Sequence, residues 1–148
     1  MGDHKSTTGY VALRANAAIA WRSVKQECTA LSSLEAEYMA AATTAREVVW
    51  LHQLLSELGY QQDVPMAMKI DNDGARELAT NAMISARMKH IELQHHYICE
   101  YINNNDIKLI SCPSKENNAD IFMKALPEPR FKQCIDKMGV ESMNCDVE

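Results

Sequence analysis

The stretch that decides the fold runs from Ser32 to Leu58 and reads SSLEAEYMAAATTAREVVWLHQLLSEL. Its apolar residues recur at intervals of three and four, which is the spacing of one face of an α-helix. Ser32 and Glu35 have the spacing of a capping box, and Gly59 stands where a helix commonly stops. The stretch therefore predicts a long helix whose apolar face must be covered by the rest of the chain.

Two short apolar runs precede this helix. They span Gly9–Arg14 and Ala18–Val24, and the residues Ala15–Ala17 separate them. Runs of this length on either side of a short turn predict a β-hairpin, although alanine is a poor strand former.

Shorter elements alternate after the long helix. Met66–Ile70 and Ile107–Ser111 alternate apolar and polar residues and are predicted strands. Helices are predicted at residues 75–79, 91–103, 117–126 and 131–138, with a basic connector at Ser85–Lys89 and with Pro127 and Pro129 as breakers. The order β-β-α-β-α-α-β-α-α predicts one mixed-sheet α/β domain over residues 1–140, followed by a frayed tail over 141–148.

The composition is that of an ordinary globular domain. The chain has 148 residues, of which 47% are hydrophobic and 24% charged, enough for one core. Its five cysteines include no Cys-x-x-Cys pair, which disfavours a disulfide framework or a zinc site and favours an intracellular location, cytoplasmic or nuclear. No run approaches the roughly 20 apolar residues of a membrane helix. The net charge of −5 counts mildly against tight, non-specific binding to nucleic acid.

Three acidic residues lie where predicted elements begin or end. Glu37 is one turn into the long helix, Asp71 follows the strand Met66–Ile70, and Asp120 falls early in the helix at residues 117–126. Site residues of α/β sheets collect at the carboxyl ends of strands. Carboxylates that converge there from separate elements can hold Mg²⁺, which prefers oxygen ligands. A pair of such ions can activate water for phosphodiester hydrolysis.

Each of these acids also has an ordinary structural explanation. Glu37 suits the positive end of the helix dipole, and so does Asp120 in its own helix. Asp71 suits a turn or an N-cap. Spacing alone therefore leaves both a metal site and three structural carboxylates open.

Six short segments of the chain form an ordered set of motifs. They are STTGYV at residues 6–11, IAWRS at 19–23, ALSSLEAEYMA at 30–40, IDNDGA at 70–75, KHIELQHH at 89–96 and ADIFMKALP at 119–127. In this order and spacing they resemble the motifs of the ribonuclease H domain of copia-type retrotransposon polyproteins. The resemblance covers about residues 5–140 and is specific because it rests on several ordered motifs. It implies a ribonuclease H-like mixed sheet flanked by helices.

The resemblance implies a role for each of the three acids. Glu37, Asp71 and Asp120 match three of the family's four acidic metal ligands, so they are the expected catalytic residues. The expected cofactor is Mg²⁺ or Mn²⁺ if the chain is active, and none otherwise. Glu37 is preferred over Glu35 because the family's helix ligand directly precedes a Tyr-Met-Ala tripeptide.

Other residues of the resembling motifs carry weaker expectations. Lys89 and His90 match the family's Lys-His-Ile motif and are candidates for the substrate side, with a structural role for His90 as the alternative. Trp21 and Trp50 are expected to be core or hairpin aromatics, and stacking on a substrate is the alternative.

The resemblance also implies that one family segment is missing. In the family, a central first strand with the first catalytic aspartate precedes the motif matched by STTGYV, whereas here only residues 1–5 precede it. Asp3 matches a loop acid after that strand and not the catalytic position. Without the strand, sheet edges carry unpaired backbone groups, which are expected to recruit a second copy or a protein partner.

Three functions remain open from these expectations. The preferred one is a retrotransposon-derived ribonuclease H-like protein that is catalytically impaired and acts through protein–protein interaction. Departures from the family motifs at Leu34, Asp73, Glu92 and Gln94 favour this impaired state. The first alternative is an active Mg²⁺-dependent ribonuclease H that cleaves the RNA strand of RNA–DNA hybrids, and the second is a non-functional polyprotein fragment. An RNA–DNA hybrid is an expected partner only if activity is retained, and no membrane partner is expected.

Overall fold

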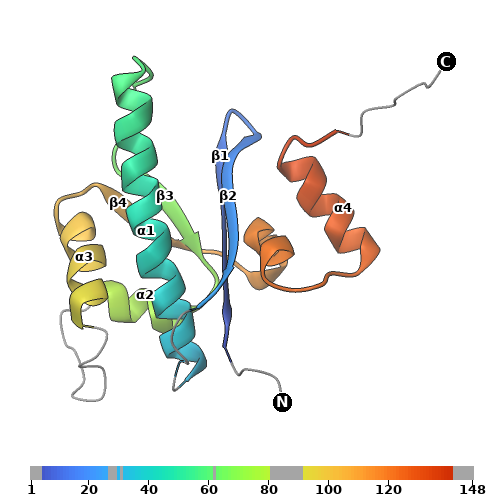
Figure 1. Ribbon diagram of the computed structural model, residues 1–148, viewed down its shortest axis with the longest axis horizontal. Helices are drawn as coiled ribbons and strands as arrows, with labels where there is room; N and C mark the ends of the chain where they lie inside the picture. Colours follow the sequence, from blue (N-terminus) through green and yellow to red (C-terminus); the bar gives the residue numbers. More distant parts are fainter. Residues whose placement is uncertain (1–4, 27–29, 31, 62, 81–91, 142–148) are drawn as a thin grey trace. The chain divides into compact units, whose positions relative to one another are not determined.

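The chain has a mixed α/β fold, as its pattern of apolar residues predicts. The computed structural model describes residues 5–26, 30, 32–61, 63–80 and 92–141 (Figure 1). These residues form two small sheets, four α-helices and two 3₁₀ helices. They belong to two compact units: unit 1 is Met1–Ser6 with Gln26–Asn117, and unit 2 is Thr7–Lys25 with Asn118–Glu148. The α/β class is thereby confirmed, while the ribonuclease H-like arrangement of the sheet and the limits of the domain stay predictions.

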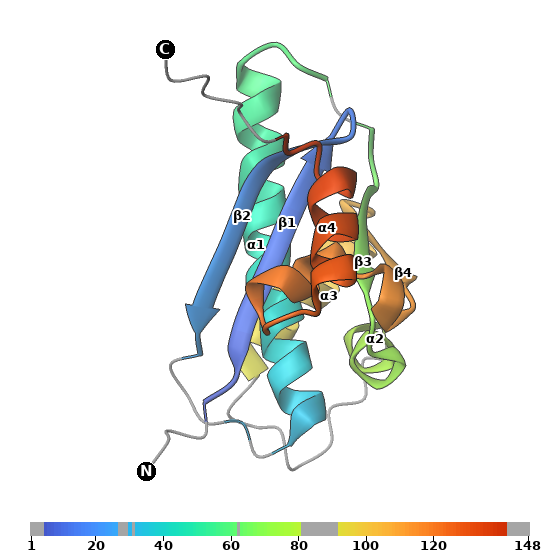
Figure 2. The ribbon, with the colours of Figure 1, turned by 90° about the vertical axis from the view of Figure 1, so that its right-hand side faces the viewer.

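Unit 2 contains the predicted hairpin. Strands β1 (Thr7–Arg14) and β2 (Ala17–Lys25) pair antiparallel, and Figure 2 shows them side by side along their length. The turn consists of Ala15 and Asn16, whose φ angles are both positive, at 49° and 61°. Positive φ at both positions gives a two-residue turn whose twist matches that of the strands. Ala17 therefore belongs to the second strand and not to the turn.

The segment after Asn117 corrects the predicted helix at residues 117–126. It forms only the 3₁₀ helix η3 (Asn118–Phe122), which follows a shorter 3₁₀ helix, η2 (Ser114–Glu116). Pro127 disfavours the α conformation for the residue before it, and an α-helix confined to so few residues gains too little from its own hydrogen bonds. Packing on the hairpin decides the conformation instead, because η3 lies directly against β1.

The last helix corrects a second boundary. Helix α4 spans Glu128–Lys137 and begins before the predicted start at Phe131 (Figure 2). Pro129 lies in its first turn, where a backbone N–H has no helical partner to lose. The proline therefore helps to start this helix, whereas the sequence pattern alone suggested a break.

Unit 1 is built around the long helix that the sequence predicts. Helix α1 spans Ser33–Glu57, and the side chain of Ser32 accepts a hydrogen bond of 3.1 Å from the backbone N–H of Glu35. Gly59 follows the helix with a φ of 82°, which is the left-handed conformation expected after a helix end. The predicted cap and stop are both confirmed.

The second sheet lies in unit 1 and is parallel. Strand β3 (Met66–Ile70) pairs with β4 (Ile107–Ser111), and both strands have their predicted bounds. Helices α2 (Asp73–Thr80) and α3 (Glu92–Asn103) pack with α1 and these strands (Figure 1). The core residues that they share are Tyr38, Ala41, Ala45, Met68, Ile70, Ala75, Ala79, Ile98 and Ile107. Small alanines on α1 allow the neighbouring elements to approach its backbone closely.

Some predicted features lie outside the described residues. These are the basic connector Ser85–Lys89, His90 and the tail from residue 142. Within the described part of the chain, no helix is both long and apolar enough to cross a membrane.

Candidate functional site

Asp71 lies where strand β3 ends. In the parallel pair of strands, Ile70 stands opposite Ser111, and the backbone N–H of Cys112 donates a hydrogen bond of 2.9 Å to the carbonyl of Ile70. The side chain of Asp71 is half-buried. Asp71 thus directly follows the last hydrogen-bonded residue of β3. This agrees with its predicted place at the carboxyl end of a strand.

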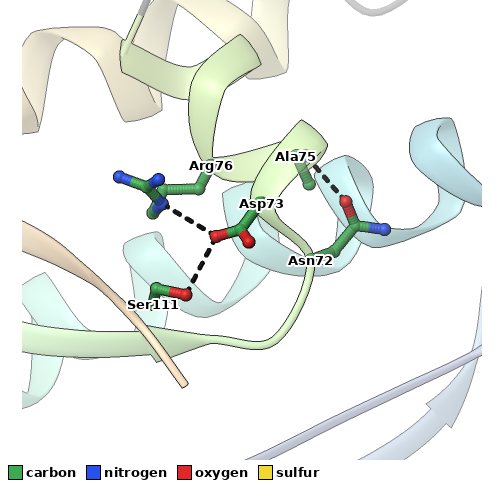
Figure 3. Close-up of polar contacts among 5 residues, drawn as sticks. All are labelled: Asn72, Asp73, Ala75, Arg76 and Ser111. Atoms are coloured by element: carbon green, nitrogen blue, oxygen red, sulfur yellow. Dashed lines mark hydrogen bonds and ion pairs between the residues drawn. The ribbon is translucent and has the colours of Figure 1, made fainter. Parts of the chain in front are cut away.

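The two residues after Asp71 are held by side-chain hydrogen bonds (Figure 3). Asn72 Oδ1 accepts a hydrogen bond of 2.9 Å from the backbone N–H of Ala75, so Asn72 caps the start of α2. Asp73 Oδ1 accepts a hydrogen bond of 2.9 Å from Ser111 Oγ and lies 3.4 Å from Arg76 Nε. Asp73 therefore ties the start of α2 to the end of β4.

Glu37 lies early in α1, in the same unit as Asp71. Its side chain is half-buried, whereas that of Glu35 is 6% exposed. A Cβ atom added at Gly74 would lie 3.1 Å from Cδ1 of Leu34, so the first turn of α1 contacts the first turn of α2. The elements that carry Glu37 and Asp71 are thus neighbours in unit 1.

Asp120 belongs to unit 2 and lies within η3. It is 4% exposed, and its Oδ2 atom lies 3.0 Å from the ammonium group of Lys124. Its backbone carbonyl accepts hydrogen bonds from the N–H groups of Met123 and Lys124. The buried carboxylate is thus stabilised by a cation one helical turn away.

The hairpin holds η3 in place. Ser23 Oγ donates a hydrogen bond of 2.5 Å to the backbone carbonyl of Phe122. Gly9 stands opposite Ser23, and a Cβ atom at Gly9 would lie 2.6 Å from Met123 Cγ and 2.9 Å from Phe122 Cβ. Glycine is therefore required at this position for η3, with its buried Asp120, to approach the strand.

The three predicted ligands are divided between the two units. Among the described residues, no group of three or more His, Cys, Asp or Glu side chains could hold a metal ion. Glu37 and Asp71 come from unit 1 and Asp120 from unit 2. Their joint action as metal ligands stays a prediction, and Lys89 and His90 lie outside the described residues.

Two other titratable groups of unit 1 have raised pKa values. Burial raises the pKa of the Tyr38 phenol far above its ordinary value, and the nearby Cys99 adds to the shift. Burial likewise raises the pKa of the Cys99 thiol, which donates a hydrogen bond of 3.2 Å to the carbonyl of Ala79. Both groups are neutral at pH 7 and belong to the packing of α1 against α3.

Sequence reasoning missed the partners of the acids. The spacing of Asp120 and Lys124 is that of an ion pair within a helix, so this contact could have been predicted. The contact between Asp73 and Ser111 joins residues 38 positions apart, and only the folded sheet brings them together.

The chain is similar in sequence to known proteins. No family model matches the chain, and no solved structure matches it. The chain is 38% identical over 140 residues to the retrovirus-related Pol polyprotein from transposon TNT 1-94 of Nicotiana tabacum. It is 36% identical over 138 residues to the Pol polyprotein from transposon RE2 of Arabidopsis thaliana.

These alignments cover 95% and 93% of the chain, but it spans only about one tenth of the length of either polyprotein. A shorter match, 47% identical over 47 residues, relates 32% of the chain to 33% of the secreted RxLR effector protein 161 of Plasmopara viticola. The long alignments carry more weight because they include almost every described element. Over nearly its whole length, the chain is thus homologous to one segment of the retrovirus-related Pol polyproteins of plant transposons.

Proposed function

We propose that the chain is a retrotransposon-derived ribonuclease H-like protein that is a poor nuclease alone and acts by pairing an open sheet edge with a strand of another polypeptide. Its similarity to Pol polyproteins supports the retrotransposon origin. The order of motifs from STTGYV to ADIFMKALP supports the ribonuclease H-like assignment.

One observation carries the strand-pairing part of the proposal. The described strands form two separate two-stranded sheets, β1 with β2 and β3 with β4. Every strand of a two-stranded sheet is an edge strand, and edge strands present backbone N–H and C=O groups that can pair with another chain. A two-stranded sheet has few strands to stabilise it, and an added strand would contribute further backbone hydrogen bonds.

Two features of the sequence support weak nuclease activity. Departures from the family motifs at Leu34, Asp73 and Glu92 favour an impaired site. The net charge of −5 also opposes contact with the phosphates of a nucleic acid. Positioning and metal binding supply most of the catalysis in phosphodiester hydrolysis, and both would therefore be poor.

The alternative function is Mg²⁺-dependent cleavage of RNA in RNA–DNA hybrids. The placement of Asp71 at the end of β3, in a unit whose α1 carries Glu37, favours it. Glu37, Asp71 and Asp120 fit a hard divalent cation because all three supply carboxylate oxygens. When bound, Mg²⁺ would activate water and stabilise the leaving oxygen. Lys124 Nζ lies 3.0 Å from Asp120 Oδ2 and supplies a positive charge beside that carboxylate.

Light scattering of the purified chain over a wide range of concentration tests the strand-pairing proposal. Association that increases with concentration is expected, since a second copy can supply the added strand. A chain that stays a well-folded monomer at every concentration would contradict the proposal if its edge amides are also protected. In that case the amide hydrogens on the outer edges of both sheets would exchange as slowly as those that bond the paired strands. Slow exchange there would mean that the edges are already covered within one chain.

A further inference from the structure

Asp71 lies between two links that join the ends of the parallel strands. One link is the hydrogen bond of 2.9 Å from the backbone N–H of Cys112 to the carbonyl of Ile70. The other is the hydrogen bond of 2.9 Å from Ser111 Oγ to Asp73 Oδ1 (Figure 3). The first link fixes the backbone just before Asp71, and the second fixes it two residues later.

The link between Asp73 and Ser111 lies at the surface. The side chain of Asp73 is 69% exposed, and Ser111 is also exposed. Solvent competes for both groups, so this hydrogen bond adds little to the stability of the whole fold. Its main effect should therefore be local, on Asp71 and Asn72, the two residues that connect β3 to α2.

We propose that Asp73, through Ser111, is a positioning residue that sets the direction of the Asp71 carboxylate for a divalent cation. The inference rests on the proposed role of Asp71 as a metal ligand. Asp73 Oδ1 accepts from Ser111 and lies near Arg76, so in this role Asp73 acts on Asp71 through the connecting backbone. A fixed carboxylate binds a cation better than a mobile one, since less conformational freedom is lost on binding.

Three other roles for Asp73 make different predictions. As a negative charge at the start of α2, Asp73 would act through the helix dipole, and Ser111 would not matter. As the partner of Arg76, Asp73 would act through the ion pair, and Arg76→Gln would reproduce its loss. If Asp73 were a direct metal ligand, its substitution would lower the metal affinity of the chain far more than substitution of Ser111.

The test measures Mn²⁺ binding to the whole chain by electron paramagnetic resonance, with Mn²⁺ as the probe and thermal unfolding recorded in parallel. Asp71→Ala defines the contribution of Asp71 itself. Asp73→Ala, Ser111→Ala and the double variant should each weaken binding to the same extent, by roughly two- to five-fold, as expected for one exposed hydrogen bond. Thermal midpoints should stay close to that of the wild type.

Two control variants separate this role from the others. Ser111→Thr keeps the hydroxyl group and should bind Mn²⁺ as the wild type does. Arg76→Gln removes the ion pair with Asp73 and should also bind as the wild type does. Weaker binding in Asp73→Ala with no change in Ser111→Ala would overturn the proposal, and so would additive losses in the double variant. A wild type that binds no Mn²⁺ through Asp71 would overturn it as well.

The outcomes also distinguish this inference from the proposed function. If the variants bind Mn²⁺ as described but the chain neither associates nor cuts a hybrid, the inference stands and the functional proposal fails. A chain that associates through its strands while all these variants bind Mn²⁺ alike keeps the functional proposal and loses the inference.

Discussion

Lys124 Nζ lies 3.0 Å from Asp120 Oδ2, and the two side chains differ strongly in burial, at 57% and 6% exposed. The lysine thus supplies, from the solvent side, the positive charge that a buried carboxylate requires. A second ion pair with the same spacing, Lys132 with Glu128, is exposed on both sides, at 69% and 76%. The two pairs therefore allow a matched comparison.

Lys124→Met should lower the free energy of unfolding by about 1 kcal/mol, because it leaves the Asp120 carboxylate buried without its cation. The loss should stay well below that of a fully buried pair, because solvent already screens Lys124. Lys132→Met should change the same quantity by less than about 0.5 kcal/mol. Urea unfolding of the three proteins measures both effects.

The same variants report on metal binding at Asp120. If Asp120 is a metal ligand, added Mg²⁺ should recover more stability in Lys124→Met than in the wild type, because the ion replaces the lost ammonium group. Equal losses in Lys124→Met and Lys132→Met, with no response to Mg²⁺, would speak against any special role of the Asp120 pair.

Gly9→Ala should destabilise the chain by about 1–3 kcal/mol, the usual cost of an extra methyl group in a tightly packed place. The new Cβ atom would lie within 3.3 Å of Met123, Phe122 and the backbone carbonyl of Ala119, so η3 must shift away from β1. Gly74→Ala is the matched control, because the nearest atom to its Cβ is the flexible end of Leu34, at 3.1 Å. Thermal unfolding should show a clear loss for Gly9→Ala only.

Stability should fall as the pH rises above about 9. The folded state raises the pKa of Cys99 from its ordinary value of 9.0, and that of Tyr38 from its ordinary value of 10.0. Above these ordinary values the unfolded chain releases both protons while the folded chain keeps them, so folding becomes less favourable. Unfolding in urea at neutral and alkaline pH measures the decline, and Tyr38→Phe should make it shallower. An unchanged decline in that variant would show that Tyr38 is not its cause.

Trp21→Lys should weaken the self-association of the chain, while Trp50→Lys should leave it unchanged. The two tryptophans are exposed to similar extents, at 60% and 57%, but Trp21 lies on strand β2 and Trp50 on helix α1. A lysine on an edge strand opposes the addition of another strand, whereas a lysine on a helix does not. Light scattering distinguishes the variants, and an equal effect of both would indicate apolar association without strand pairing.

The sequence predicted the long helix and the strands well because their signals are local. The N-cap at Ser32 and the alternation in Met66–Ile70 each act within a few residues, and the structure has both features. The segment around Asp120 was predicted poorly, because its 3₁₀ form depends on packing against Gly9, more than 100 residues earlier. The hydrogen bond between Asp73 and Ser111 was not predicted for the same reason, since it exists only once β3 and β4 are paired.

Poor nuclease activity of the isolated chain is the core of the proposed function. A cleavage assay on an RNA–DNA hybrid with Mg²⁺ or Mn²⁺, comparing the wild type with Asp71→Asn, tests it most directly. The wild type is expected to cut no faster than Asp71→Asn. Efficient cleavage of the RNA strand by the wild type, lost in Asp71→Asn, would contradict it and establish the alternative function.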